Sequence, residues 1–176
     1  QGMHKMRENE KIYANTGNDK VTAVIPVAGD HLGEYSMEEI SQDIPIAMLD
    51  INGKPLLQRQ VEVLNRCKIS DIRVIGGYKA EKINVDGVKL MHNHDYVKTG
   101  ILFSIMCGLK SIRGSAIVIY GDVLFDHFLI RKLLECASDI VIVTDTTFNE
   151  TRKTLKRNCE LVITNRCIEH AKRTLY

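Results

Sequence analysis

The sequence lacks paired cysteines. It has five cysteines, an odd number, and no two of them form a C-x-x-C pair. Several of them lie inside apolar runs. A structural zinc site needs ligands at paired spacings, and a secreted disulfide framework needs an even set. We therefore expect no zinc site, thiols that pack as small apolar side chains, and a reducing, cytoplasmic location.

The sequence also lacks long apolar runs and an excess of charge of one sign. No apolar stretch approaches the roughly 18 residues of a membrane span, and the N-terminus is polar, so neither a span nor a signal peptide is predicted. The 24 basic and 22 acidic residues are interspersed along the sequence, so no cluster of basic residues predicts nucleic-acid binding. We expect small-molecule partners, with no nucleic acid and no membrane; a fused domain or a homo-oligomer stays open.

What is present is the composition of an ordinary globular protein. Hydrophobic residues make up 44% and charged residues 26% of a 176-residue chain, a length that suits one domain with its own core. Residues 1–20 are polar without an apolar period and predict a flexible arm. The arm begins with Gln1-Gly2 before Met3, which is typical of a tag remnant. A single domain is predicted over residues 21–176.

Residues 21–57 are the stretch around which the chain is organised. They open with a continuous apolar run, residues 21–28, which predicts a fully buried strand of a parallel sheet. A long polar connection follows from Gly29-Asp30, and loops of that length in compact domains are usually functional or disordered. NGKP at 52–55 then predicts a turn with proline at a helix start, and the helix continues to about Cys67 with Gln60 facing water.

Strands and helices alternate through the rest of the chain. Further strands are expected at 71–75, 85–91, 116–120 and 139–144, with helices at 100–112 and 127–137. Thr99 and Asp126 precede the two helices and are predicted to cap them. The alternation predicts a three-layer α/β/α fold around a mostly parallel, twisted, Rossmann-like sheet with right-handed crossovers.

Asp122 is the strongest candidate for chemistry. Ligands of such sheets bind at the carboxyl ends of the strands, near the point where the strand order reverses. Asp122 directly follows the apolar run 116–120 and Gly121, which allows close approach. A carboxylate in this position can hold Mg²⁺ against substrate phosphates. The alternative is an aspartate that caps the turn into the next helix, and position alone does not separate the two.

The first loop and Lys54 are weaker candidates for phosphate binding. The loop carries Gly29 and Gly33, where a backbone can pass close to phosphates. It contains neither G-x-G-x-x-G nor G-x-x-x-x-G-K-[ST], and its basic candidate is His31. Lys54 could reach a phosphate or be a solvated turn residue. His92 and His94 alternate like a metal pair, but without a third ligand nearby a surface loop is favoured.

Five segments together resemble one enzyme family. They are VIPVAG (24–29), DIPIAMLDINGKPLLQRQVEVL (43–64), DIRVIGGYKAEKI (71–83), GVKLMHNHDY (87–96) and IVIYGDVLFD (117–126). In this order they resemble the nucleotidyltransferases that build NDP-sugars. The resemblance is nearest to phosphocholine or phosphonate cytidylyltransferases and to the nucleotidyltransferase domain of phosphoenolpyruvate mutase fusions. It implies that a phosphorylated acceptor attacks the α-phosphorus of an NTP, with CTP favoured, and that pyrophosphate is released.

The resemblance also implies roles for individual residues. Asp122 would hold Mg²⁺, and Lys54 is carried over as the catalytic residue. The backbone after Ala28 would face the triphosphate, and the segment from Thr99 to Ser104 would contribute to the nucleoside pocket. The implied nucleotide-binding set is Ala28, Gly29, Asp30, His31, Gly77, Thr99 and Ser104.

Departures from the family pattern leave the activity open. No arginine lies between Val21 and Lys54, where the family's first loop carries one, and Ile46 stands where the family has a lysine. Asp139 and Asp145 are the candidates for a second metal-binding aspartate, and Asp139 fits poorly because it begins a predicted strand. The sequence is therefore compatible with an active Mg²⁺-dependent cytidylyltransferase or with a shortened, catalytically degenerate nucleotide-binding or assembly domain. A glycosyltransferase fits the G-K-P-L-L stretch less well.

Overall fold

The computed structural model describes residues 20–30 and 43–144 of the 176-residue chain. The predictions for the arm before Lys20, for His31 and most of the polar connection, and for Asp145 lie outside these residues. The chain divides into two compact units, residues 1–136 and 137–176. All described helices and strands belong to the first unit.

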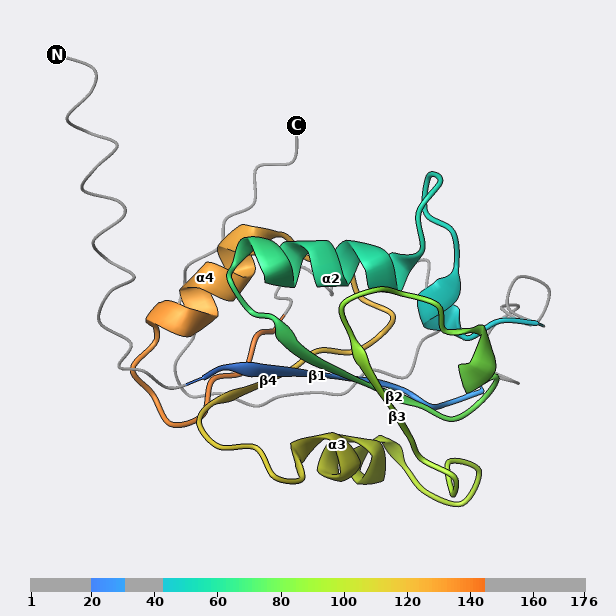
Figure 1. Cartoon of the computed structure of the whole chain (residues 1–176). Helices are drawn as coiled ribbons and strands as arrows, with labels where there is room; N and C mark the ends of the chain where they lie inside the picture. Colours follow the sequence, from blue (N-terminus) through green and yellow to red (C-terminus); the bar gives the residue numbers. More distant parts are fainter. Residues whose placement is uncertain (1–19, 31–42, 145–176) are drawn as a thin grey trace, which may run out of the picture. The chain divides into compact units, whose positions relative to one another are not determined.

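A four-stranded parallel sheet forms the centre of the first unit (Figure 1). Its strands are β1 (Thr22–Val27), β2 (Asp71–Gly76), β3 (Lys89–His92) and β4 (Ala116–Val118). They lie in the order β3-β2-β1-β4, and each neighbouring pair is parallel. Every residue of β1 is buried, as expected for an apolar run covered on both faces. The predicted first strand is confirmed.

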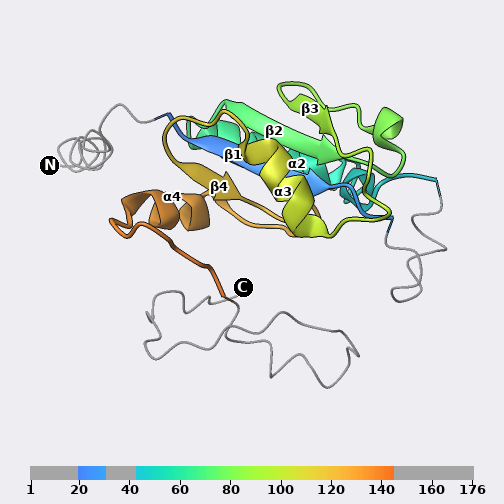
Figure 2. The same ribbon diagram turned by 90° about the horizontal axis from the view of Figure 1, so that it is seen from below.

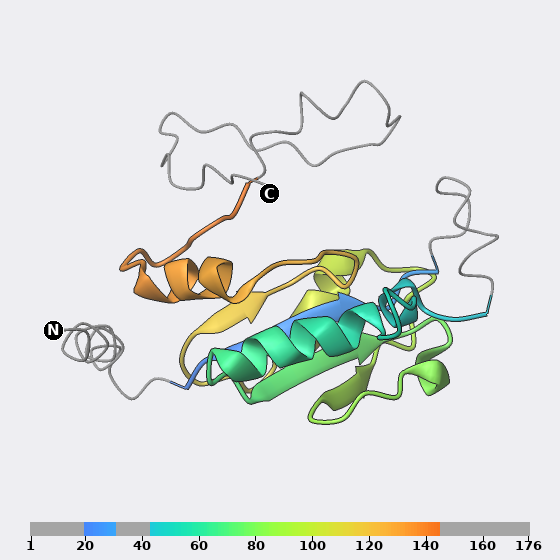
Figure 3. The same cartoon turned by 90° about the horizontal axis from the view of Figure 1, so that it is seen from above.

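Helices cover both faces of this sheet. On one face lie α2 (Leu56–Arg66) and α4 (His127–Glu135), and on the other lies α3 (Ile101–Leu109). Figure 2 shows α3 in front of β1 when the sheet is seen from below, and Figure 3 shows α2 over it from above. Short 3-10 helices form at η2 (Ile46–Met48) and η3 (Ala80–Lys82). The predicted three-layer α/β/α fold is confirmed.

The chain reverses its direction across the sheet after β3. The connection from β1 to β2 passes through α2 on one face, and the connection from β3 to β4 passes through α3 on the other. Because the two connections cross the sheet in opposite directions, opposite faces give them the same hand, as parallel crossovers require. The strand order therefore reverses between β1 and β4, which is where sheets of this kind bind ligands.

A tight hairpin turn leads into α2. Asn52 and Gly53 have φ angles of 52° and 78°, and the Ile51 amide donates to the Lys54 carbonyl at 2.9 Å. Positive φ at both central positions defines the type I′ turn, for which Asn-Gly is a preferred pair. The predicted turn at 52–55 and the helix after it are confirmed.

Three predicted features are wrong in detail. The N-cap of α3 is Gly100, because the Thr99 hydroxyl instead donates to the Asp95 carbonyl at 2.9 Å. The strand predicted at 116–120 ends at Val118 and has one neighbour within the described sheet, β1. Residues 139–144 form no strand, since a strand needs a hydrogen-bonded neighbour and none pairs with this segment within 20–30 and 43–144. Among the described helices, none has the length and apolarity to cross a bilayer.

Candidate functional site

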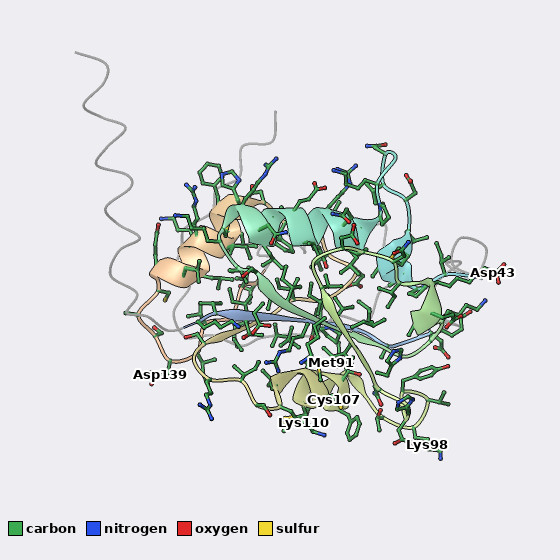
Figure 4. The ribbon with its side chains drawn as sticks, viewed as in Figure 1. Asp43, Met91, Lys98, Cys107, Lys110 and Asp139 are labelled. Carbon is green, nitrogen blue, oxygen red and sulfur yellow. The ribbon has the colours of Figure 1, made fainter. Side chains whose placement is uncertain are left out.

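Because the four strands are parallel, their carboxyl ends meet at one edge of the sheet. The segments leaving this edge are 28–30, 77–79, 93–100 and 119–126. Figure 4 labels Lys98 and Asp43 on this side of the molecule. Apart from Lys54, and from Asp139 in the second unit, every described residue predicted to bind nucleotide or metal lies in one of these segments or in the α3 helix that follows one.

A backbone hydrogen bond connects the segments that follow β1 and β2. The Tyr78 amide donates to the Ala28 carbonyl at 3.0 Å. A Cβ atom on Gly77 would lie 2.7 Å from that same carbonyl oxygen and 2.7 Å from the ring of Tyr96, so the position requires glycine. Ala28 is buried and Gly29 is exposed. The structure therefore brings Gly77 against Ala28, and the chain becomes exposed to solvent at Gly29.

A buried amide organises the segment between β3 and α3. Asn93 is 2% exposed, and its backbone N–H donates to the Gly76 carbonyl at 2.8 Å. Its side-chain Nδ2 donates to the hydroxyls of Thr99 and Ser104, each at 3.0 Å. The two residues predicted for the nucleoside pocket are thus held together by a third. Sequence analysis missed Asn93, although an amide directly after a strand was the available signal.

Asp122 lies where β4 has ended, next to the end of β1. The Ile119 amide still donates to the Val24 carbonyl at 3.0 Å, and the chain then turns at Gly121. A Cβ on Gly121 would clash with the Val27 side chain, so this turn packs tightly against β1. Asp122 itself is half-buried. The predicted metal ligand therefore sits at the reversal point between β1 and β4.

Hydrogen bonds from α2 hold the loop that carries Asp122. Gln60 is 1% exposed, and its side-chain Nε2 donates to the carbonyls of Tyr120 at 2.9 Å and Val123 at 2.7 Å. The prediction that Gln60 faces water is therefore wrong. The helical pattern predicts that polar residues of α2 face solvent. Gln60 is an exception because its buried amide is the hydrogen-bond donor for two loop carbonyls.

The residues present fit magnesium better than a metal held by protein alone. Within the described residues there is no group of three or more His, Cys, Asp or Glu side chains that could hold a metal. Mg²⁺ is commonly bound through one or two carboxylates together with substrate phosphates and water. A single carboxylate at the strand ends, as Asp122 provides, suits that arrangement.

Lys54 is engaged on the hairpin before α2. Its Nζ bonds both carboxylate oxygens of Glu62, at 2.7 and 2.8 Å, and the hydrogen bond lowers the pKa of Glu62. The structure therefore pairs Lys54 with a residue of α2, and does not join it to the strand-end segments through any described contact.

Lys79 is a cation at the strand ends that sequence analysis did not single out. It follows Tyr78 directly, and its Nζ lies 2.7 Å from a carboxylate oxygen of Asp43. The hydrogen bond to Asp43 raises the pKa of Lys79. The same ammonium lies 5.4 Å from the centre of the Tyr78 ring. Lys79 thus places a positive charge close to the point where β1 and β2 end.

Comparison with known proteins gives a family model and several relatives. The model described as the MobA-like NTP transferase domain matches residues 45–173. A CTP:phosphoglutamine cytidylyltransferase of Campylobacter jejuni is 25% identical over 139 residues, 73% of this chain and 54% of that protein. A choline-phosphate cytidylyltransferase of Streptococcus pneumoniae is 29% identical over 115 residues, 63% of this chain and 49% of that protein.

A solved structure is similar to the fold. A nucleotidyl transferase from Methanothermobacter thermautotrophicus has a TM-score of 0.55 at 20% sequence identity, covering 68% of this chain and 58% of that one. This likeness supports the Rossmann-like architecture. The chain spans about half the length of the curated relatives just named.

Proposed function

The chain belongs to the MobA-like NTP transferase family, and we propose that it transfers CMP from CTP to a phosphorylated or phosphonate acceptor. Pyrophosphate is the second product. The preference for CTP is supported by two relatives whose names describe cytidylyltransferases. Their acceptors, phosphoglutamine and choline phosphate, are both phosphorylated small molecules, which supports an acceptor of that class.

The observation that carries the proposal is the position of Asp122. Its loop packs through Gly121 against the end of β1, at the reversal of strand order where folds of this kind bind ligands. The following helix has its own cap, because the Asp126 carboxylate accepts from the amides of Phe128 and Leu129. This arrangement favours a ligand-binding role for Asp122.

The proposed reaction forms one bond and breaks one. An acceptor oxygen attacks the α-phosphorus of CTP in line, while the bond from that phosphorus to the bridging oxygen breaks and pyrophosphate leaves with the electron pair. The protein has little covalent work to do, so positioning and charge neutralisation carry the rate. Mg²⁺ held by Asp122 would supply neutralisation of the phosphate charge.

The chain's own residues divide the work of binding. We place the nucleoside beside Thr99 and Ser104, whose hydroxyls Asn93 orients. The triphosphate lies along the backbone after Ala28, which Gly77 supports by packing closely against the Ala28 carbonyl. Lys54 stays the proposed catalytic cation, which requires its ammonium to exchange Glu62 for a phosphate.

Calorimetry with CTP, UTP, ATP and GTP in the presence of Mg²⁺ tests this proposal. We expect the tightest binding with CTP among the four nucleotides. We also expect pyrophosphate release when a phosphorylated acceptor is added. Asp122→Asn should reduce release by about a hundredfold or more, as loss of a metal ligand or charge stabiliser does. Asp86→Asn is the matched control, because Asp86 is an exposed turn residue. Equal release by Asp122→Asn and the wild type would reject the metal assignment.

A degenerate nucleotide-binding domain is the second candidate. It is favoured by Ile46 and by the absence of arginine between Val21 and Lys54, which remove two cations expected of the family. This candidate predicts Mg²⁺-dependent binding heat with an NTP but little or no pyrophosphate release with any acceptor. Ile46→Lys should then raise any residual rate. If no NTP gives heat, both candidates fail and an assembly role takes their place.

A further inference from the structure

Gln60 connects the first crossover helix to the loop that carries Asp122. One side-chain nitrogen of Gln60 donates to two carbonyls, those of Tyr120 at 2.9 Å and Val123 at 2.7 Å. These two residues stand on either side of the Gly121-Asp122 turn. A single amide group therefore holds both ends of the turn to α2.

The same turn is also held from the side of the sheet. Gly121 is buried against Val27 of β1, with no room for a Cβ atom. The contacts from Val27 and from Gln60 leave the two-residue turn little freedom to tilt or slide. The backbone position of Asp122 is therefore fixed relative to both β1 and α2.

The cost of placing an amide here argues that its two donated bonds are needed. Gln60 is 1% exposed, and its Oε1 is buried with no hydrogen-bond partner in the structure. A buried polar atom without a partner is unfavourable. An apolar side chain of the same length would avoid that cost if the position served packing alone. The bonds to the loop are what an apolar side chain could not provide.

We infer that Gln60 is a positioning residue, which holds the Asp122 turn so that the carboxylate is in place for the divalent cation of the nucleotide complex. This inference rests on the proposed function. Gln60 touches no substrate in it and acts through Asp122. Residues that orient metal-binding groups typically change metal affinity or activity by about 10- to 100-fold when replaced.

The test compares Gln60→Met with Gln58→Met. Both changes remove an amide of the same length from α2, but Gln58 is on the partly exposed surface of the helix and Gln60 is buried. In Gln60→Met we expect the Mg²⁺ concentration for half-maximal pyrophosphate release to rise about 10-fold or more. The Michaelis constant for CTP at saturating Mg²⁺ should change less than about twofold, because the nucleoside contacts at Thr99 and Ser104 are elsewhere. Gln58 bonds Glu62, the partner of Lys54, so the control is read on the metal requirement alone: the Mg²⁺ concentration for half-maximal release in Gln58→Met should match that of the wild type.

Two measurements that do not depend on turnover accompany the kinetics. Binding of Mn²⁺ in the presence of CTP, followed by electron paramagnetic resonance, should weaken in Gln60→Met by a similar factor. Hydrogen exchange at the amides of residues 121–124 should accelerate, with exchange in β1 unchanged. In an Asp122→Asn background, Gln60→Met should cause no further loss of Mn²⁺ affinity, since the residue through which it acts is already removed.

The outcomes separate this inference from the proposed function. If the wild type needs Mg²⁺ for release and Gln60→Met behaves as Gln58→Met, the positioning role is rejected and the proposed function stands. If the wild type binds no NTP, both fail. An additive loss in the Asp122→Asn background would also reject the role, because it would indicate a general structural defect. Should Gln60→Met not fold, Gln60→Asn, which keeps an amide of shorter reach, is measured in its place with the same expectation.

Discussion

Asn93 uses its side chain in three hydrogen bonds inside the protein. Its Nδ2 donates to the hydroxyls of Thr99 and Ser104, and its Oδ1 accepts from the Asp95 amide at 3.0 Å. Through these bonds it links the end of β3 to the first turns of α3. A buried group with all its partners present stabilises the fold, whereas removing it leaves those partners unsatisfied.

We predict that Asn93→Ala lowers the free energy of unfolding by about 3 kcal/mol, at about 1 kcal/mol for each of the three bonds. It should also weaken CTP binding, because the Thr99 and Ser104 hydroxyls lose their common donor. Urea denaturation and calorimetry measure the two effects. Asn84→Ala is the control, since Asn84 is exposed. Equal unfolding free energies for the two variants would contradict the role of Asn93.

At the scale of the element, α4 has a well-formed N-terminus. The Asp126 carboxylate accepts from the Phe128 amide at 2.9 Å and from the Leu129 amide at 3.2 Å. The predicted cap is therefore confirmed. Sequence analysis found it because an aspartate directly before an apolar helical pattern is a local signal, independent of the rest of the fold.

Asp126→Ala should lower the free energy of unfolding by about 1 kcal/mol, the usual cost of losing a capping side chain. Asp126→Asn keeps an oxygen that can accept both amides, and should cost only a few tenths of a kcal/mol. Thermal and urea unfolding of the two variants measure the difference. If the two variants lose the same stability, the charge of Asp126 rather than its capping geometry would be responsible.

Local signals also explain which elements could be predicted. The buried run of β1 and the Asn-Gly turn before α2 each depend on a few adjacent residues, and both were correct. Gln60 could not be placed, because its partners lie about 60 residues later and a helical period does not include them. The strand predicted at 139–144 failed for a related reason, since an apolar run becomes a strand only when a neighbour pairs with it.

At the scale of the whole molecule, the candidate site is assembled by strand order. Ala28, Gly77, Asn93 and Asp122 are far apart in the sequence, yet parallel pairing brings the segments that contain them to one edge. The rule that ligands bind at this edge selected Asp122 from the sequence. It could not indicate which side chains hold the edge together. The roles of Asn93 and Gln60 depend on contacts between elements, so only the packed structure revealed them.

At the opposite end of the sheet, the Asp71 carboxylate connects β2 to β1 and to the residue Lys20 before it. The Thr22 hydroxyl of β1 donates to the Asp71 carboxylate of β2 at 2.9 Å, and the Lys20 ammonium lies 3.3 Å from the same oxygen. Partial burial alone would raise the pKa of Asp71. The hydrogen bonds and charges around the carboxylate outweigh this effect and lower the pKa below its ordinary value.

A lowered pKa makes the stability of the whole fold depend on pH. Because the folded protein holds Asp71 ionised more readily than the unfolded chain does, its contribution is complete above the unfolded pKa and is lost as the pH falls through the folded pKa. Asp71→Asn keeps an acceptor for Thr22 and removes the charge. We expect it to be less stable than the wild type by about 0.5–1 kcal/mol near neutral pH, because Lys20 is largely exposed and screened. The difference should shrink below about pH 4. Urea unfolding across this range measures it, with Asp86→Asn as control, and a difference that persists unchanged in acid would mean that the charge of Asp71 does not stabilise the sheet.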